Sequence, residues 1–194
     1  MTVTLSVQAH SNHLFTTLLQ SGVEVKTSST IEMGSFLCQL PGFTPEYISK
    51  TVETIFLDGT PVDALNQTFS GSNPTLALSA SMPGLAGAIF RKNSIHSALR
   101  TATDKTDQLQ QDQQEISVTL KLFNSIAKER GGDLLSNGVS IKVAKLLNFL
   151  ERRPELCDYI TDIELGSETV TFAEFLTGIS QLQSINLKVR NANG

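Results

Sequence analysis

Two stretches of this chain repeat one pattern in the same order. Residues 18–26 (LLQSGVEVK) correspond to residues 134–142 (LLSNGVSIK). A segment of alternating apolar and polar residues precedes each copy, at residues 3–7 and at residues 118–122. An internal repeat decides how many folding units a chain contains, so it constrains the fold before any other feature.

The correspondence continues beyond this pattern. Phe36-Leu37 and Pro41 match Phe149-Leu150 and Pro154 at one offset, and Tyr47-Ile48 then matches Tyr159-Ile160. Residues 55–62 parallel residues 163–170 once the loop is shortened. Chance similarity between two amphipathic stretches is the alternative, but the preserved order favours an internal duplication. The duplication predicts that Phe36 and Phe149 are buried at equivalent core positions.

A polar run separates the two copies. Residues 104–115 consist almost entirely of Asp, Gln, Lys, Thr and Glu, and such a segment has no apolar face to bury. It is interpreted as a linker or an exposed helix. The predicted halves are therefore residues 1–103, of which residues 75–103 form an extension, and residues 116–194.

The elements expected in each half indicate an α+β fold. An alternating strand leads into a helix that ends near Gly22 or Gly138, and a return strand and a second helix follow, at residues 31–40 and 143–152. Thr44-Pro45 has the residues of a helix N-cap and first turn. Asp58-Gly59 predicts a hairpin turn, after which come a strand at residues 75–80 and a helix at residues 95–103.

This order of elements resembles the ubiquitin-like β-grasp fold of the sulfur-carrier type, here in tandem. The resemblance lies in Leu120-Lys-Leu-Phe123 with Gly131-Gly132, and in residues 57–62, Leu76-Ala-Leu78 and Pro83-Gly84. Such carriers act through a free C-terminal Gly-Gly, whereas this sequence ends Asn191-Ala-Asn-Gly194. Carrier chemistry would therefore require processing after Gly84 or Gly87.

Composition argues against several classes of function. A net charge of −4 and the absence of tryptophan disfavour nucleic-acid binding. The longest apolar stretch, residues 75–90, is interrupted by proline and glycine, so no membrane span is expected. Without a basic, apolar leader at residues 1–7, we expect a cytoplasmic protein. Cys38 and Cys157 are expected to be reduced and buried rather than joined in a disulfide.

Catalytic signals are sparse. The chain has three histidines and two cysteines, and no nucleophile elbow, phosphate loop or zinc-protease motif is present. His10 and His13 could share a helical face, but zinc would need a further ligand, so they are interpreted as surface histidines. No metal or cofactor is expected, the catalytic residues are unknown, and an enzyme is disfavoured.

Residues 75–103 contain basic side chains and no acidic residue, although the protein as a whole is acidic. A glycine-rich loop in this segment could present backbone N–H groups to an anion or to a partner, with basic side chains beside it. A tight connection with solvated basic ends is the alternative. The candidate binding residues are Met82, Gly84, Gly87, Arg91, Lys92, His96 and Arg100.

Three functions remain open at this stage. The favoured hypothesis is a non-catalytic binding or assembly module that presents this basic segment to a protein partner, with homo-oligomerisation possible. The first alternative is a small-anion-binding protein or an enzyme with a site between the halves, where His96 would act as acid or base. The second alternative is a processed ubiquitin-like carrier.

Overall fold

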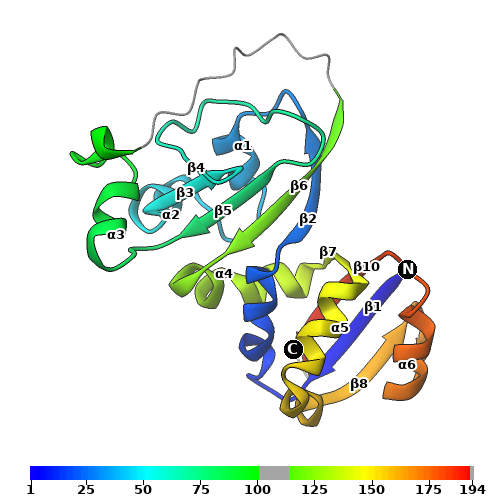
Figure 1. The fold of residues 1–194 in the computed structure, drawn as a ribbon. Coiled ribbons are helices and arrows are strands. Elements are labelled where there is room, and N and C mark those ends of the chain that lie inside the picture. Colours follow the sequence, from blue (N-terminus) through cyan, green and yellow to red (C-terminus); the bar gives the residue numbers. More distant parts are fainter. Residues whose placement is uncertain (101–113, 193–194) are drawn as a thin grey trace. The chain divides into compact units, whose positions relative to one another are not determined.

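The computed structural model describes residues 1–100 and 114–192 (Figure 1). The protein is mixed α+β, and its described residues form ten strands together with α-helices and short 3-10 helices. The chain divides into two compact units. Unit 1 comprises Met1–Glu24 and Ala127–Gly194, and unit 2 comprises Val25–Ile126.

Unit 2 is built on five strands in the order β4-β3-β5-β6-β2. β5 and β6 are parallel, whereas β3 is antiparallel to both β4 and β5. Its strands are β2 (Val23–Ser28), β3 (Thr54–Leu57), β4 (Thr60–Pro61), β5 (Thr75–Ser79) and β6 (Glu115–Leu122). Its helices are α1 (Met33–Cys38), α2 (Pro45–Lys50), α3 (Gly84–Phe90) and η2 (Ser97–Leu99).

The core of unit 2 lies on one face of this sheet. Leu76 and Leu78 of β5 alternate with half-exposed residues, as do Leu120 and Leu122 of β6, and all four leucines are fully buried. Phe36 of α1 is also buried and contacts Phe69 edge to face, with 5.1 Å between ring centroids. Alternation along the strands therefore leaves the opposite face of the sheet open.

Unit 1 also has five strands, in the order β7-β10-β1-β8-β9. Its central pair, β1 and β10, is parallel, and β8 is antiparallel to β1. Its strands are β1 (Thr2–Val7), β7 (Val139–Lys142), β8 (Ile160–Leu165), β9 (Glu168–Thr169) and β10 (Ser184–Asn191). Its helices are η1 (Asn12–Gln20), α5 (Val143–Glu151), η3 (Pro154–Tyr159) and α6 (Phe172–Ile179), and α4 (Asn124–Asn137) runs into it from unit 2.

Several predicted elements are confirmed, because their signals are local. Thr44 caps α2, and its Oγ1 accepts the Tyr47 N–H at 3.1 Å. Asp58 and Gly59 both have positive φ in the hairpin between β3 and β4. Gly22 and Gly138 likewise have positive φ, each directly before a strand. The α+β class follows from these elements.

The two units divide the chain differently from the predicted halves at residues 1–103 and 116–194. β6 begins the second predicted half but lies beside β5 in unit 2, and β1 begins the first half but lies between β10 and β8 in unit 1. Thus β6, the first strand of the second half, belongs to unit 2, which contains most of the first half. Likewise β1, the first strand of the first half, belongs to unit 1, which contains most of the second half. Residues 104–113 of the predicted linker lie outside the described residues, and Glu115 already belongs to β6.

Two other details of the predicted repeat differ from the structure. Phe149 was expected to be buried like Phe36, yet it is half-exposed in α5, because it lies at the edge of the helix face that Leu146 and Leu150 bury. The helix expected at residues 31–40 is shortened to Met33–Cys38. Of the helix expected at residues 95–103, the described part contains the short η2, and residues 101–103 lie outside it.

Candidate binding site

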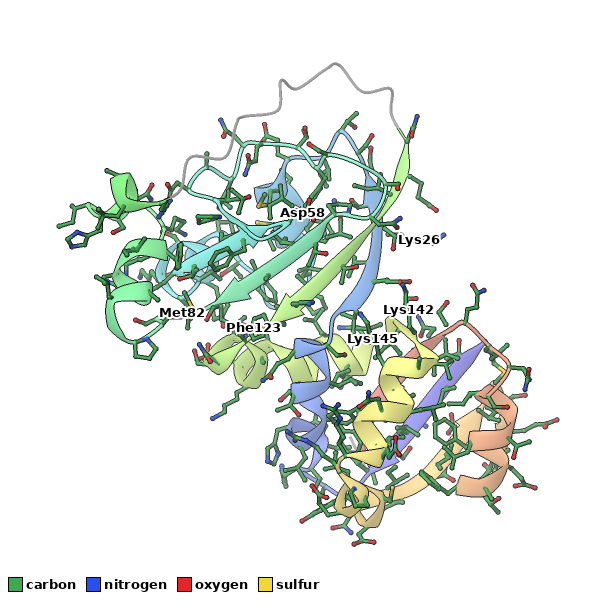
Figure 2. The ribbon with its side chains drawn as sticks, viewed as in Figure 1. Lys26, Asp58, Met82, Phe123, Lys142 and Lys145 are labelled. Carbon is green, nitrogen blue, oxygen red and sulfur yellow. The ribbon has the colours of Figure 1, made fainter. Side chains whose placement is uncertain are left out.

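A trough with a volume of about 500 Å³ lies along β5 on the open face of unit 2. Its floor contains Ala77, and its walls include Phe56 of β3 and Phe123, which follows β6. Met82 closes one end of this β5 trough, and Gly59 of the hairpin lies at the other. Figure 2 labels Met82 and Phe123 at one end of β5 and Asp58 at the opposite end.

The trough results from side-chain size along three neighbouring strands. Strand register places Phe56 opposite Ala77, and Ala77 opposite Lys121. Thr75, Ala77 and Ser79 all have short side chains, so the central strand forms a low floor between the longer side chains of β3 and β6. Side chains on the same face of adjacent strands stand close together, which makes the walls continuous.

Hydrogen bonds fix both ends of the β5 trough. At the hairpin, Asp58 Oδ1 accepts the Thr75 N–H at 2.7 Å. At the other end, Asn124 Nδ2 donates to Ser79 Oγ at 2.9 Å. The polar groups at the two ends are thereby partly satisfied within the chain, and the middle of the trough is apolar except for Lys121, which lies opposite Ala77. It has the character of a ligand pocket, which typically combines apolar walls with a few polar groups.

The corresponding open face of unit 1 is polar instead. Arg190 of β10 and Glu164 of β8 form an ion pair of 2.7 Å across β1, and Arg190 Nε also donates to Ser6 Oγ at 3.4 Å. A face of this kind is an ordinary solvated surface. The open faces of the two units therefore differ in chemistry, because unit 2 has an apolar trough where unit 1 has an ion pair.

The glycine-rich loop predicted as a binding nest forms the start of α3. Gly84 has a φ of 74° and open space around it, so its conformation rather than lack of room requires glycine. A Cβ on Gly87 would stand 1.7 Å from the Met82 carbonyl oxygen, so only glycine allows α3 to approach Met82. Both glycines are thus explained by the local fold of residues 82–90.

The basic side chains of this segment are bonded within unit 2. Arg91 Nε lies 2.8 Å from Glu53 Oε2, and Arg91 Nη2 donates to Ser81 Oγ. Lys92 Nζ donates to the Ile48 carbonyl at 3.1 Å. Burial lowers the pKa of Lys92, and the Glu53 carboxylate opposes that effect in part. These two cations anchor residues 91–92 to the rest of the unit.

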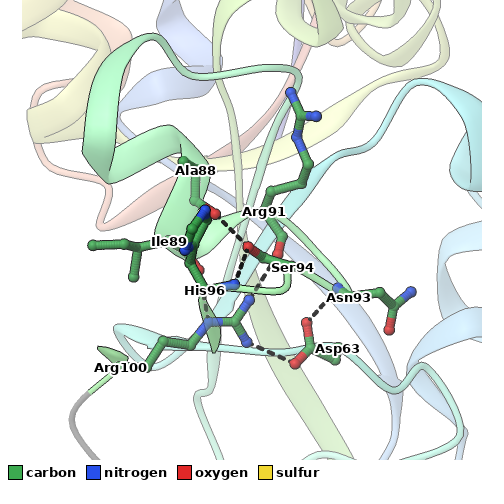
Figure 3. Close-up of polar contacts among 8 residues, drawn as sticks. All are labelled: Asp63, Ala88, Ile89, Arg91, Asn93, Ser94, His96 and Arg100. Atoms are coloured by element: carbon green, nitrogen blue, oxygen red, sulfur yellow. Dashed lines mark hydrogen bonds and ion pairs between the residues drawn. The ribbon is translucent and has the colours of Figure 1, made fainter. Parts of the chain in front are cut away.

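Arg100 is the most completely bonded of the predicted site residues (Figure 3). Its Nη1 pairs with Asp63 Oδ2 at 2.6 Å, its Nε donates to the Ile89 carbonyl, and its Nη2 donates to the Arg91 carbonyl. Asp63 Oδ1 also accepts the Asn93 N–H at 2.8 Å. Arg100 and Asp63 together tie residues 89–100 into one structured loop.

His96 and three apolar residues of the same segment face solvent. The His96 side chain is exposed, and its backbone N–H donates to Ser94 Oγ. Leu85, Ile95 and Leu99 expose 71%, 91% and 66% of their surface. We call residues 82–100 the α3 segment. Its cations form hydrogen bonds and ion pairs within the chain, whereas its large apolar side chains are exposed to solvent.

Acidification should loosen the α3 segment. Burial of Asp63 opposes its ionisation, but hydrogen bonds from Arg100 and the Asn93 amide, with the charge of Arg100, hold its pKa below the ordinary 3.8. A depressed carboxyl pKa stabilises the fold fully above that ordinary value, and the contribution is lost as pH falls below it. The Asn93 amide and Arg100 Nε–H should then exchange faster in NMR titrations.

The matched control for this pH effect is Asp63→Asn, which keeps the shape of the side chain and removes its charge. This variant should already show rapid exchange at neutral pH and little further change on acidification. Equal protection of the Asn93 amide in both proteins down to the lowest pH at which the chain remains folded would show that the ion pair does not hold the loop.

A second hollow of unit 2, of about 430 Å³, is lined by Cys38 and Lys92 beside Asp63. Cys38 is a free thiol but is exposed rather than buried as predicted, and Lys92 Nζ donates to the Ile48 carbonyl. In unit 1, Cys157 is a free thiol whose pKa is raised by burial and by the charges of Asp158 and Glu155. A raised pKa disfavours the nucleophilic thiolate.

The structure gives the remaining polar candidates no shared site. His13 Nδ1 contacts the His10 carbonyl oxygen at 2.7 Å, so the pair is joined through the backbone rather than through two rings. In the described residues, no three side chains of the metal-ligating types gather closely enough to hold an ion. The described helices are all too short or too polar to cross a bilayer.

Sequence reasoning missed the β5 trough as a site. The signal was present as short residues alternating along β5, as Phe56 in β3 and as Phe123 directly after β6, but their proximity depends on strand register. No protein family, curated protein or solved structure was found to match this chain. The case for function therefore rests on the geometry of unit 2.

Proposed function

We propose that this protein is a binding or assembly module and that the α3 segment is the surface on which a protein partner docks. Large apolar side chains at the surface cost solvation free energy unless a partner covers them, so clusters of them mark interaction sites. The observation that carries the proposal is the grouping of Leu85, Ile95 and Leu99 within residues 82–100, each more than half exposed.

The bonded cations support the same proposal. Arg91 pairs with Glu53, Lys92 donates to the Ile48 carbonyl, and Arg100 pairs with Asp63. These contacts give the α3 segment a defined conformation before a partner binds. Preorganisation of this kind reduces the entropy lost on association. The role proposed for the basic residues is therefore to position the apolar side chains, rather than to contact the partner or an anion.

The β5 trough and the α3 segment adjoin through Phe90. Its ring lies 5.4 Å from that of Phe56, which forms a wall of the trough, and Met82 belongs to both features. Processing after Gly84 or Gly87, as the carrier hypothesis requires, would cut α3 after its first residue or after the residue that packs against Met82. For this reason we favour an intact binding module over a processed carrier.

The test replaces the exposed apolar residues in one variant, Leu85→Ser/Ile95→Ser/Leu99→Ser. Proteins retained by the immobilised wild-type chain should be lost with this variant, because the apolar contact area is removed while the bonds of Arg91 and Arg100 remain. Sedimentation of the purified protein applies the same test to self-association, since a partner could be a second copy of the chain.

The matched control is Tyr159→Ser, which removes an exposed aromatic residue from unit 1. It should retain the same proteins as the wild type. Retention of an identical set by the triple variant, with unchanged sedimentation, would refute the proposed docking surface. A folded state of the variants is checked by their circular dichroism.

We further propose that the chain arose by duplication of a β-grasp-like unit, with the first strands of the two copies exchanged. Support comes from the shared order of strand, helix, glycine turn, return strand and helix in both copies, and from the parallel central pair in each unit. The two units differ in the neighbour of the return strand. In unit 2 the return strand β2 lies beside β6, which is the first strand of a copy, whereas in unit 1 the return strand β7 lies beside β10, which is the last strand of a copy.

A further inference from the structure

We propose that the β5 trough binds an amphipathic carboxylate, with the apolar body of the ligand along β5 and its carboxylate on Lys121. This site adjoins the α3 segment at Met82, but its lining does not include Leu85, Ile95 or Leu99 of the partner-binding surface. The inference begins from the composition of the trough, whose lining contains one cationic side chain and no acidic one.

Lys121 has the position that such a ligand requires. It follows Leu120 in β6, and strand alternation turns it to the open face, where it lies opposite Ala77. Among the described residues, none forms a hydrogen bond or ion pair with its ammonium group. A cation beside an apolar trough can therefore bind an external anion without first breaking an internal contact.

The walls select an apolar body for that anion. Phe56, Met82 and Phe123 provide ring and thioether surfaces around the low floor at Ala77. Aromatic and methionine side chains contact alkyl and aryl groups favourably, and Met adapts to their shape. The volume of about 500 Å³ lies within the range of small-molecule sites.

Charge balance favours a carboxylate over a phosphate ester. A dianionic phosphate would bring a second charge into a trough with a single cation, and an unpaired charge beside apolar walls is unfavourable. A neutral alcohol would forgo the ion pair with Lys121, and an amine would be repelled by it. The predicted order of affinity is octanoate first, then octanol and octyl phosphate, with octylamine weakest.

The experiment is an NMR titration of the full chain with octanoate, octanol, octyl phosphate and octylamine. Octanoate should cause saturable shifts of the Ala77 methyl group and of the Phe56 and Phe123 rings. Lys121→Met should weaken octanoate binding by about tenfold, as expected for loss of one charge-assisted hydrogen bond, and should leave octanol binding unchanged.

Two further variants make the result decisive. Lys188→Met replaces a half-exposed lysine of β10 in unit 1 and should leave octanoate binding unchanged. Ala77→Leu should fill the floor of the trough and abolish binding of octanoate and octanol alike. If Ala77→Leu fails to fold, the comparison of Lys121→Met with Lys188→Met decides the question.

The proposal is overturned if octanol binds wild-type protein as tightly as octanoate, if Lys121→Met binds octanoate normally, or if the Ala77 and Phe123 signals do not move. None of these outcomes affects the partner-binding surface, because the tested side chains exclude Leu85, Ile95 and Leu99. Conversely, loss of partner retention in the triple variant leaves the octanoate titration unchanged.

Discussion

A fragment of residues 25–126 should fold and unfold cooperatively, whereas a fragment of residues 1–103 should remain unfolded. The first fragment contains the compact unit 2 with the strand order β4-β3-β5-β6-β2 almost complete. The second contains the first of the two halves predicted from the sequence but lacks β6, which lies between β5 and β2.

The burial free energy lost with β6 is large enough to keep the 1–103 fragment unfolded. Val118, Leu120 and Leu122 are each fully buried, and burial of one such side chain contributes about 2 kcal/mol. Their sum, roughly 6 kcal/mol, is comparable to the whole stability of a small domain. The loss of β6 also removes one of the two strands that are hydrogen-bonded to β5.

Circular dichroism and urea unfolding of both fragments measure this difference. The control is the fragment of residues 25–126 with Leu120→Asp, which places an unpaired charge in the core and should be unfolded as well. Cooperative unfolding of the 1–103 fragment would contradict the assignment of β6 to unit 2 and would restore the sequence-based halves as the folding units.

Phe36→Ala should destabilise the protein by about 3–5 kcal/mol, the usual cost of removing a buried aromatic ring. Phe36 is 1% exposed, and its ring meets that of Phe69 edge to face. Because α1 is short, the surrounding residues can fill the resulting cavity only in part. Urea unfolding should show the loss, and amides of residues 25–126 should lose protection from hydrogen exchange.

Phe149→Ala is the matched comparison, because the two phenylalanines occupy corresponding places in the proposed repeat. Phe149 is half-exposed, with Phe15 at 6.3 Å between centroids and the Arg153 guanidinium 5.5 Å above its ring. Its truncation should cost about 1–2 kcal/mol. Equal destabilisation by the two substitutions would contradict the burial difference between these positions.

The sequence-based prediction placed candidate binding residues in the α3 segment but did not identify the intramolecular partners of its cations. Glycines and cations in one short stretch suggested an anion- or partner-binding loop. The carboxylates of Glu53 and Asp63 and the carbonyl of Ile48, however, are far from this stretch in sequence and close to it in space. The hydrogen-bonding partner of a cation depends on tertiary structure. The composition of the segment could therefore not reveal that Glu53, Asp63 and the Ile48 carbonyl bind its cations.

Local signals determined much of the fold from the sequence alone. Thr44 as an N-cap, Asp58-Gly59 as a hairpin and Gly22 and Gly138 at the ends of helical segments each act within a few residues, where backbone preference and short hydrogen bonds dominate. The alternation of apolar residues similarly identified β1 and β6 as strands with at least one buried face.

Tertiary structure alone decided which strands are neighbours. β1 and β6 have similar sequences and both pair in parallel with a distant strand, yet β1 lies beside β8 whereas β6 lies beside β2. An alternating strand specifies which of its faces is buried but not which strand it pairs with, because pairing depends on the complementarity of the whole unit. That choice brought Phe56, Ala77 and Lys121 into one row and so created the β5 trough.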